Sequence, residues 1–452
     1  MALTGIQILK MLPKKNCGEC KIPTCLAFAM KVAAGQIDIA ECPYVDEEVK
    51  NTIGEASAPP IRTIKIGAGD DLFTVGGETC LFRHEKRFEN PTGIAVLIAT
   101  DMDEAAINGR IERFGKLQYE RVGVLMKADL IAVKDAKNDE GSFCDLVKKV
   151  MADAPTASLI LISDNTANMK AASAIAKDKK PLLFGANADN AKDMAALAKE
   201  IDCPVGVKGS NLDDAITVSE ALQAEGIKDL IIDTGSRTIK GALEDNVAAR
   251  RAAINKKFKP LGFPTITFPC EMADDDLMEA MLASVLLAKY AGIVVLSDLQ
   301  GETLFPLLLE RLNIFTDPQR PMVVEEDTYP LNGPGEDSPV LITCNFSLTY
   351  FIVSGEIESS NVPSWLLIKD TEGLSVLTAW AAGKFGADLI AQFIKKSGIE
   401  DKVKHRDLII PGYLATIKGE LEEELPDWTI LIGPREAGHL PAFLKEWKPS
   451  NS

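Results

Sequence analysis

Residues 182–232 read LLFGANADNAKDMAALAKEIDCPVGVKGSNLDDAITVSEALQAEGIKDLII, and this stretch decides the fold. It contains three short apolar runs, Leu182–Phe184, Val205–Val207 and Leu230–Ile232. Two stretches with helical periodicity separate these runs, Asn190–Glu200 and Leu212–Ala224. Continuous apolar strands that alternate with helices are typical of a parallel sheet covered by helices. The stretch therefore predicts consecutive β-α units of an α/β protein.

The same alternation continues outward in both directions. Five more apolar runs belong to it: Ile94–Ala99, Leu130–Val133, Leu159–Ile162, Thr265–Phe268 and Ile293–Leu296. A helical stretch, Leu277–Lys289, precedes the last run. Eight strands, each followed by a helix over roughly 230 residues, have the count and size of a TIM barrel. We therefore expect a central (β/α)8 barrel.

Two stretches rich in small residues and proline mark the limits of this barrel. Gly54–Pro60 is predicted to be a linker, and the next domain boundary is predicted at Pro318–Pro339. Both stretches are candidate hinges. After the first of them, Ile61–Phe88 alternates apolar and polar residues between turn glycines, which predicts a β-ribbon. We therefore expect three domains, at residues 1–58, 59–322 and 323–452.

The last domain has four further apolar runs, Val340–Cys344, Trp365–Lys369, Leu408–Pro411 and Trp428–Gly433. Helices are expected at Ser375–Ser397 and Ala415–Leu425, which gives an open, Rossmann-like α/β sheet. Such sheets bind ligands beyond the carboxyl ends of their strands. The loops there are small, polar and glycine-bearing: Thr343–Ser347, Lys369–Ser375, Pro411–Gly412 and Gly433–Arg435. They favour a pocket for a bulky ligand, and ordinary turn chemistry is the alternative.

The N-terminal domain is built around Cys17-Gly-Glu-Cys20-Lys-Ile-Pro-Thr-Cys25 and Cys42-Pro43. Four thiolates at these spacings, with a final Cys-Pro, are typical of an iron–sulfur cluster, and a [4Fe–4S] cluster is expected. Zinc and unligated cysteines are the alternatives; structural zinc sites mostly use two short-spaced pairs, whereas only one is present here. Helices are predicted around the cysteines, at Thr4–Leu12, Cys25–Gly35 and Tyr44–Ile53.

Composition excludes several classes of protein. The chain has 452 residues and a net charge of −17, which argues against a nucleic-acid or anionic-membrane surface. No signal-peptide pattern opens it, and no apolar run approaches the roughly 18 residues of a membrane span. The other five cysteines stand far apart and are expected to be reduced thiols, as in a cytoplasmic protein: Cys80, Cys144, Cys203, Cys270 and Cys344.

No phosphate-binding loop or dinucleotide fingerprint occurs in the chain, so nucleotide binding is unsupported. Inside the barrel, Asp164, Asn187 and Asp233 follow the third, fourth and sixth strands, at the face where barrel active sites form. Their donors and acceptors would suit a flat heterocycle such as a pterin. The alternative is that these residues cap helices or orient loops.

With the cysteine motif, the barrel and the terminal α/β domain in this order, the chain resembles a known family. It is similar to the large (gamma) subunits of corrinoid/iron–sulfur proteins of the reductive acetyl-CoA pathway, over essentially its whole length. The most specific elements are Cys17, Cys20, Cys25 and Cys42, followed by the loop Lys369-Asp-Thr-Glu-Gly-Leu-Ser375.

The resemblance implies a [4Fe–4S] cluster on the four cysteines and a cobamide in the terminal domain. The corrinoid is expected to lie against Thr343, Phe346, Thr349, Asp370, Thr371, Glu372, Gly373, Leu374, Ser375, Gly412, Gly433, Pro434 and Arg435. The cobalt-ligating motif D-x-H-x-x-G of other families is absent, and the three histidines, His84, His405 and His439, are isolated. A base-off corrinoid without a histidine ligand is therefore expected.

The function implied is that of a methyl carrier with an electron-transfer module in an anaerobe's cytoplasm. Its cobalt would cycle between Co(I) and methyl-Co(III), and the cluster would return Co(II) to Co(I). The implied partners are a small subunit in a heterodimer, a methyltetrahydrofolate methyltransferase, acetyl-CoA synthase, and a reductive activator or ferredoxin. Two alternatives remain open: a barrel methyltransferase binding methylpterin through Asp164, Asn187 and Asp233, and an iron–sulfur electron carrier without corrinoid.

Overall fold

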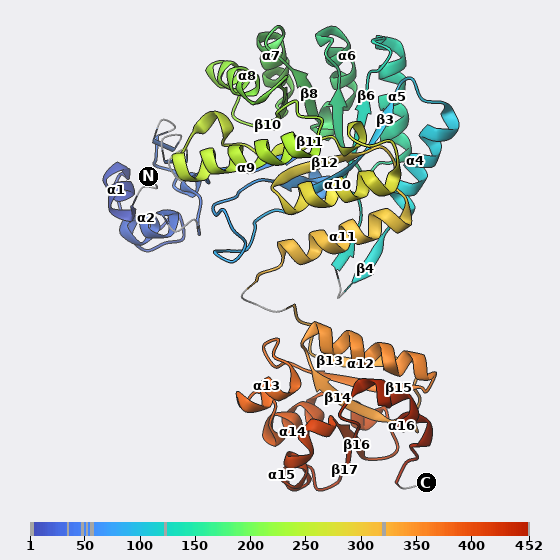
Figure 1. The fold of residues 1–452 in the computed structure, drawn as a ribbon. Coiled ribbons are helices and arrows are strands. Elements are labelled where there is room, and N and C mark those ends of the chain that lie inside the picture. The colour runs from blue at the N-terminus through green and yellow to red at the C-terminus, as the bar shows by residue number, and fades with distance from the viewer. Residues whose placement is uncertain are drawn as a thin grey trace. The chain divides into compact units, whose positions relative to one another are not determined.

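The computed structural model describes residues 4–33, 36–46, 49–50, 53–54, 58–121, 124–318 and 322–450 (Figure 1). The contacts within the chain divide it into two compact units. Residues 1–118 and 127–315 form the first unit, and residues 119–126 and 316–452 form the second. We call them the barrel unit and the terminal unit.

A closed barrel of eight parallel strands forms the centre of the barrel unit, in the order β10-β11-β12-β3-β6-β7-β8-β9. Its strands are β3 (Gly93–Ala99), β6 (Leu130–Lys134), β7 (Ser158–Ile162), β8 (Leu182–Ala186), β9 (Val205–Lys208), β10 (Leu230–Asp233), β11 (Thr265–Thr267) and β12 (Ala291–Leu296). All eight predicted apolar runs lie on these strands, so the expected TIM barrel is confirmed.

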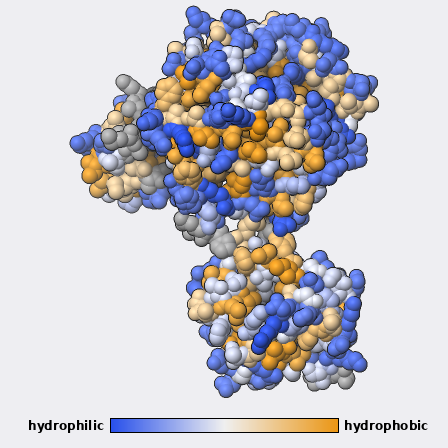
Figure 2. Space-filling model, in the orientation of Figure 1, coloured by the Kyte–Doolittle hydropathy of each residue, from blue (hydrophilic) through white to orange (hydrophobic). Residues whose placement is uncertain are grey.

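Eight helices surround the barrel: α4 (Glu104–Lys116), α5 (Glu140–Asp153), α6 (Thr166–Ala176), α7 (Ala191–Ile201), α8 (Leu212–Ala224), α9 (Ile239–Lys256), α10 (Asp276–Ala288) and α11 (Gly301–Phe315). Six of them begin at an N-cap side chain that accepts a backbone N–H: Asp103, Asp139, Asn165, Asn211, Thr238 and Asp275. These caps satisfy N–H groups that the helix itself leaves unpaired, and so fix where each helix starts. Hydrophilic residues dominate much of the visible helical surface (Figure 2), but α10 exposes four apolar side chains: Leu277, Met278, Met281 and Val285.

Before the barrel, the chain forms α1 (Gly5–Met11), α2 (Cys25–Ala33) and two short strands, β1 (Ile64–Ile66) and β2 (Phe73–Val75). The strands pair antiparallel, so the predicted ribbon is real but shorter than Ile61–Phe88. The chain after β2 is instead fixed by Arg250, which donates to Glu78 at 3.0 Å and to the Cys80 carbonyl at 2.7 Å. The predicted helix Tyr44–Ile53 falls partly outside the described residues, and Tyr44 itself lies in a turn.

The terminal unit holds a five-stranded sheet in the order β13-β15-β14-β16-β17. Its strands are β13 (Asp327–Leu331), β14 (Val340–Cys344), β15 (Ser364–Lys369), β16 (Asp407–Ile410) and β17 (Thr429–Ile432). Successive residues face opposite sides: Val340 and Ile342 enter one core, whereas Leu341 enters the other. Helices therefore cover both faces, as expected for an open α/β sheet: α12 (Ser347–Ser360), α13 (Val376–Ala381), α14 (Ala387–Lys396), α15 (Lys418–Glu424) and α16 (Leu440–Glu446).

Strand β13 corrects the expectation that the whole of Pro318–Pro339 is a hinge. It pairs antiparallel with β15 along its whole length, and its Leu331 is buried in a core. Just before it, the Val324 N–H donates to the Asn345 carbonyl at 2.9 Å. The stretch from residue 322 onward is therefore part of the terminal sheet and cannot serve as a hinge.

Other predicted bounds also shift. The helix expected at Ser375–Ser397 is two helices, because Gly383 adopts φ +69° after α13 and ends it. A second two-stranded hairpin, β4 (Tyr119–Arg121) with β5 (Val124–Met126), was not expected and groups with the terminal unit. Across the described residues, no helix combines the length and the apolar character needed to cross a membrane.

Candidate functional site

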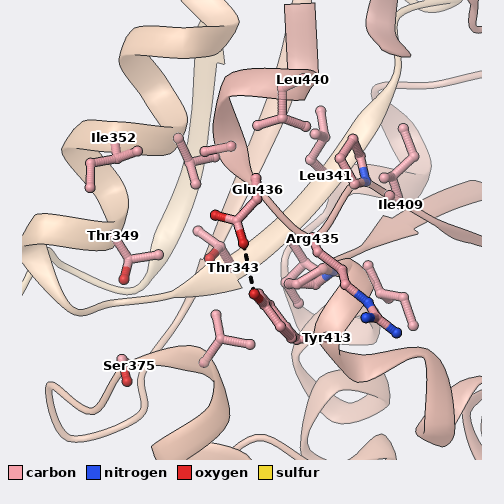
Figure 3. A pocket seen from close by; sticks show the side chains of 18 of the residues that line it. Leu341, Thr343, Thr349, Ile352, Ser375, Ile409, Tyr413, Arg435, Glu436 and Leu440 are labelled. Carbon is pink, nitrogen blue, oxygen red and sulfur yellow. Dashed lines mark hydrogen bonds between the residues drawn. The ribbon is translucent and has the colours of Figure 1, made fainter.

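The terminal sheet has a topological switch point between β14 and β16. The chain leaves β14 towards β15 on one side and later returns to β16 on the other side of β14. At such a point the two connections diverge and leave a crevice beyond the carboxyl ends of the strands. The structure has a cavity of about 350 Å³ there, and residues at the strand ends line it: Thr343 (Figure 3), Pro411 and Gly433.

The wall of this cavity is mainly apolar and comes from both sides of the sheet. Aliphatic side chains on strands and on α12 and α16 form it: Leu341, Ile342, Ile352, Val353, Ile409 and Leu440. Thr343, Thr349 and Ser375 add hydroxyl groups. A pocket that is apolar with a few polar groups is the usual form of a site for a large organic ligand.

Tyr413 and Glu436 also line the cavity. The Tyr413 hydroxyl donates to the Glu436 carboxylate at 2.7 Å (Figure 3). This hydrogen bond raises the pKa of Tyr413, because the phenol loses it on ionisation. The Arg435 guanidinium lies 5.9 Å from the centre of the Tyr413 ring.

The expected corrinoid residues fall into two groups. Six line the cavity: Thr343, Thr349, Ser375, Gly433, Pro434 and Arg435. Seven others shape the neighbouring loops without lining it: Phe346, Asp370, Thr371, Glu372, Gly373, Leu374 and Gly412. Their contact with a ligand stays a prediction.

Asn345 organises the loop after β15, and the sequence prediction missed it. Its Oδ1 accepts from the Thr371 N–H at 3.0 Å, the Thr371 hydroxyl at 2.9 Å and the Gly373 N–H at 3.0 Å. Its Nδ2 donates to Asp370 at 2.8 Å. Asn345 and Thr371 are both buried, so these bonds replace water and fix the loop beside the cavity.

The turn within that loop needs a glycine. Glu372 and Gly373 have φ of +57° and +76°, and the Leu374 N–H bonds to the Thr371 carbonyl. A turn with two central residues at positive φ is of type I′, in which glycine is favoured. Gly412 is required for a different reason: a Cβ there would come within 2.5 Å of the Gly433 carbonyl oxygen.

No histidine among the described residues lines the cavity. His405 is buried, with Nε2 at 2.9 Å from the Ser338 carbonyl oxygen and Nδ1 accepting from the Asp407 N–H at 3.1 Å. It precedes β16, whereas the cavity lies at the other end of that strand. His439 is exposed next to Leu440, and His84 stacks on Phe82.

Three of the four predicted cluster ligands lie at one small core in the barrel unit. Cys42 is part of this core, Cys20 and Cys25 pack against it, and Cys17 is exposed. Cys25 begins α2, and its thiol accepts from the Asn16 N–H at 3.4 Å. Backbone N–H groups aimed at sulfur, and a helix N-terminus, both favour thiolates that carry a cluster's negative charge.

This module does not have the arrangement of a single-ion site. Among the described residues, no three cysteine, histidine or acidic side chains come together closely enough to hold one metal ion. Zinc needs all its sulfurs at about 2.3 Å from one centre, whereas a cluster spreads its ligands over several irons. The spacing of the four cysteines and the final Cys42-Pro43 are typical of a cluster.

The mouth of the barrel is occupied by its own ion pairs. Asp233 is buried and accepts from Arg237 at 3.0 and 2.8 Å, and Arg237 also contacts Glu271. Asp164 pairs with Lys208 at 2.8 Å, and Asn187 accepts the Asp189 N–H at 3.0 Å. Asn187 and Asp233 thus orient the loops that follow them, whereas Asp164 holds an exposed ion pair. Pterin binding by these three residues stays a prediction.

Comparison with known proteins covers nearly the whole chain. A family model described as CO dehydrogenase/acetyl-CoA synthase delta subunit matches residues 63–444, and one described as putative Fe-S cluster matches residues 12–44. The corrinoid/iron-sulfur protein large subunit of Moorella thermoacetica is 43% identical, over 98% of this chain and 99% of the relative. The chain belongs to the family of corrinoid/iron–sulfur protein large subunits.

A second relative of the family is archaeal. The acetyl-CoA decarbonylase/synthase complex subunit gamma of Methanopyrus kandleri is 36% identical, over 98% of both chains. Among solved structures, dihydropteroate synthase from Anaplasma phagocytophilum is 16% identical over 50% of this chain and 100% of its own, with a TM-score of 0.36, too distant to bear on function. The family and fold class expected from the sequence are confirmed.

Proposed function

We propose that this chain is a methyl-group carrier of the acetyl-CoA pathway, with a corrinoid in the terminal unit and an iron–sulfur cluster on the cysteine module. The cavity at the switch point carries this proposal. It gives the chain a site for a large organic ligand in one unit, whereas the four thiols lie in the other. A simple electron carrier would not need the first site.

The residues of the terminal unit would bind and position the corrinoid. The aliphatic wall of the cavity would exclude water from the bound macrocycle, and the loop held by Asn345 would keep Ser375 in place at the cavity. About 350 Å³ is too small to enclose a whole corrinoid, so the remaining surface would be covered by a partner. The absence of a lining histidine among the described residues supports base-off binding, in which no imidazole ligates the metal.

When bound, cobalt would supply the nucleophile that accepts the methyl group, and the cluster would supply one electron for reactivation. The cofactors bring this chemistry, and the protein brings position and access. The relatives' designation as a large subunit supports a small-subunit partner. A methyltransferase that uses methyltetrahydrofolate, acetyl-CoA synthase, and a reductive activator or ferredoxin are the further proposed partners, in the cytoplasm of an anaerobe.

The cavity can be tested by filling it. Thr349 on α12 points into it, whereas its neighbour Leu348 is 57% exposed and does not line it. We expect Thr349→Trp, purified anaerobically with the small subunit, to retain at least tenfold less corrinoid by visible absorption than Leu348→Trp. Both variants should keep the cluster absorption. Equal corrinoid retention in the two variants would show that the corrinoid does not use this cavity.

A further inference from the structure

Cys17 is held less firmly by the protein than the other predicted cluster ligands. It is exposed, whereas Cys20 and Cys25 are half-buried and Cys42 is buried. The Cys20 thiol donates to a backbone carbonyl at 3.8 Å, and the Cys25 thiol accepts from a backbone N–H at 3.4 Å. Among the described residues, none forms a hydrogen bond with the Cys17 thiol. The position of Cys17 therefore depends on the residues that flank it.

The loop that carries Cys17 has an unfavourable backbone conformation. Lys14, Asn16 and Lys21 adopt φ of +53°, +46° and +63°. Asparagine tolerates this region better than lysine does. The Asn16 side chain is also fixed, because its Oδ1 accepts from the Cys25 N–H at 2.8 Å. A loop of this kind needs contacts from other parts of the chain to stay in one conformation.

Tyr44, two residues after Cys42, supplies such contacts on both sides of Cys17. Its hydroxyl donates to the Glu19 carboxylate at 2.6 Å, and the Lys15 ammonium lies 3.7 Å from the centre of its ring. Lys15 comes two residues before Cys17, and Glu19 comes two residues after it. One side chain thus joins the segment of the last predicted ligand to both flanks of the first.

Tyr44 is 39% exposed, and an exposed tyrosine is usually a surface residue without a special role. Each of its two contacts is also weak by itself, since both lie in solvent. Their placement gives them an effect, because both act on one short segment, Lys15–Glu19. A short surface segment opens when few contacts break, so two weak contacts suffice to change how often it opens.

We propose that Tyr44 is a positioning residue that holds the segment Lys15–Glu19 in place, so that Cys17 stays on the cluster. Tyr44 acts through Cys17 and is not itself a ligand. The proposal rests on the proposed function, because it takes the four cysteines as the cluster ligands. Without Tyr44 the segment should open more often and expose the Cys17 thiolate, while the other three cysteines stay at the core of the module.

Site-specific alkylation measures this opening. A free thiolate attacks iodoacetamide, so that a sulfur–carbon bond forms and iodide leaves, whereas a thiolate bound to iron is protected. The full chain, with its small subunit and cluster, is incubated anaerobically with iodoacetamide. Mass spectrometry then gives the labelling rate of each cysteine, with fragment spectra to separate Cys17 from Cys20.

Four variants make the test specific. Tyr44→Phe removes the hydrogen bond to Glu19 and keeps the ring against Lys15, whereas Tyr44→Ala removes both contacts. Glu19→Gln keeps an oxygen that can accept from the Tyr44 hydroxyl. Val32→Ala, at a buried position in the core of the module, is the control for a general loss of stability.

We expect Cys17 to be labelled about threefold faster in Tyr44→Phe, about tenfold faster in Tyr44→Ala, and within about twofold of the natural rate in Glu19→Gln. The other three cysteines should keep their rates in these variants. Val32→Ala should instead raise the rates of all four together, because it loosens the whole module.

Two results would overturn the proposal. One is an unchanged rate at Cys17 in Tyr44→Ala. The other is an equal increase at all four cysteines in that variant, because Tyr44 would then only stabilise the module. Rapid labelling of Cys17 in natural protein with full iron content would instead contradict its assignment as a ligand, and with it the cluster site of the proposed function.

Discussion

At the scale of single residues, the buried Asn345 side chain fixes the conformation of the whole loop after β15. Its replacement by alanine leaves the buried N–H groups of Thr371 and Gly373 without their acceptor, in a place that water does not reach. We expect Asn345→Ala to lower the free energy of unfolding of the terminal unit by about 2–4 kcal/mol, measured by urea denaturation. Ser359→Ala, on the exposed side of α12, should change it by less than about 0.5 kcal/mol. A similar small change for both variants would show that the loop does not depend on Asn345.

His439 decides whether a histidine can ligate the cobalt. Both ring nitrogens of His405 are engaged at the far end of β16, whereas His439 directly precedes Leu440, which lines the cavity in the same unit. We expect the Co(II) EPR spectrum of the natural protein to lack nitrogen superhyperfine splitting, and His439→Ala to leave it unchanged. Splitting that disappears in His439→Ala, but persists in the control His84→Ala, would contradict base-off binding.

Among the elements, the cysteine module should be separable from the corrinoid site. Cys20, Cys25 and Cys42 share a core with α1 and α2, and none of the four cysteines lines the cavity of the terminal unit. We therefore expect Cys20→Ala to lower the iron content or change the cluster type while the corrinoid content stays the same. Cys144→Ala, a thiol on α5 far along the chain, serves as the control. Full iron content and an unchanged reduced-state EPR spectrum in Cys20→Ala would exclude Cys20 as a ligand.

The elements also show what a sequence can and cannot predict. The barrel strands were predictable because parallel strands buried on both faces are continuously apolar, as in Leu159–Ile162. Strand β13 was missed because Asp327 and Pro330 make an edge strand look like a linker. The hydrogen bonds of Asn345 join it to residues about 25 positions further along the chain, and no local sequence pattern indicates these bonds. Aliphatic residues such as Ile409 line the cavity, yet in the sequence they cannot be distinguished from the core.

At the scale of the whole molecule, the division into two units predicts that the terminal unit can fold without the barrel unit. The terminal sheet has its own core on each face, so a fragment of residues 316–452 should unfold cooperatively by circular dichroism. A shorter fragment, residues 340–452, loses β13 together with Val324 and Leu331 of one core, and should be measurably less stable. An unfolded longer fragment would show that the terminal unit needs the rest of the chain. The division into three domains stays a prediction.

The proline in β13 bears on how the protein behaves in crowded solution. β13 is an outer strand of the terminal sheet, and strands in this position present free N–H and C=O groups to other molecules. Pro330 removes one N–H from that row, and Asp327 places a charge at its start. Sheets of neighbouring molecules are therefore hindered from joining edge to edge. The residue that made this strand look like a linker thus protects the protein against aggregation.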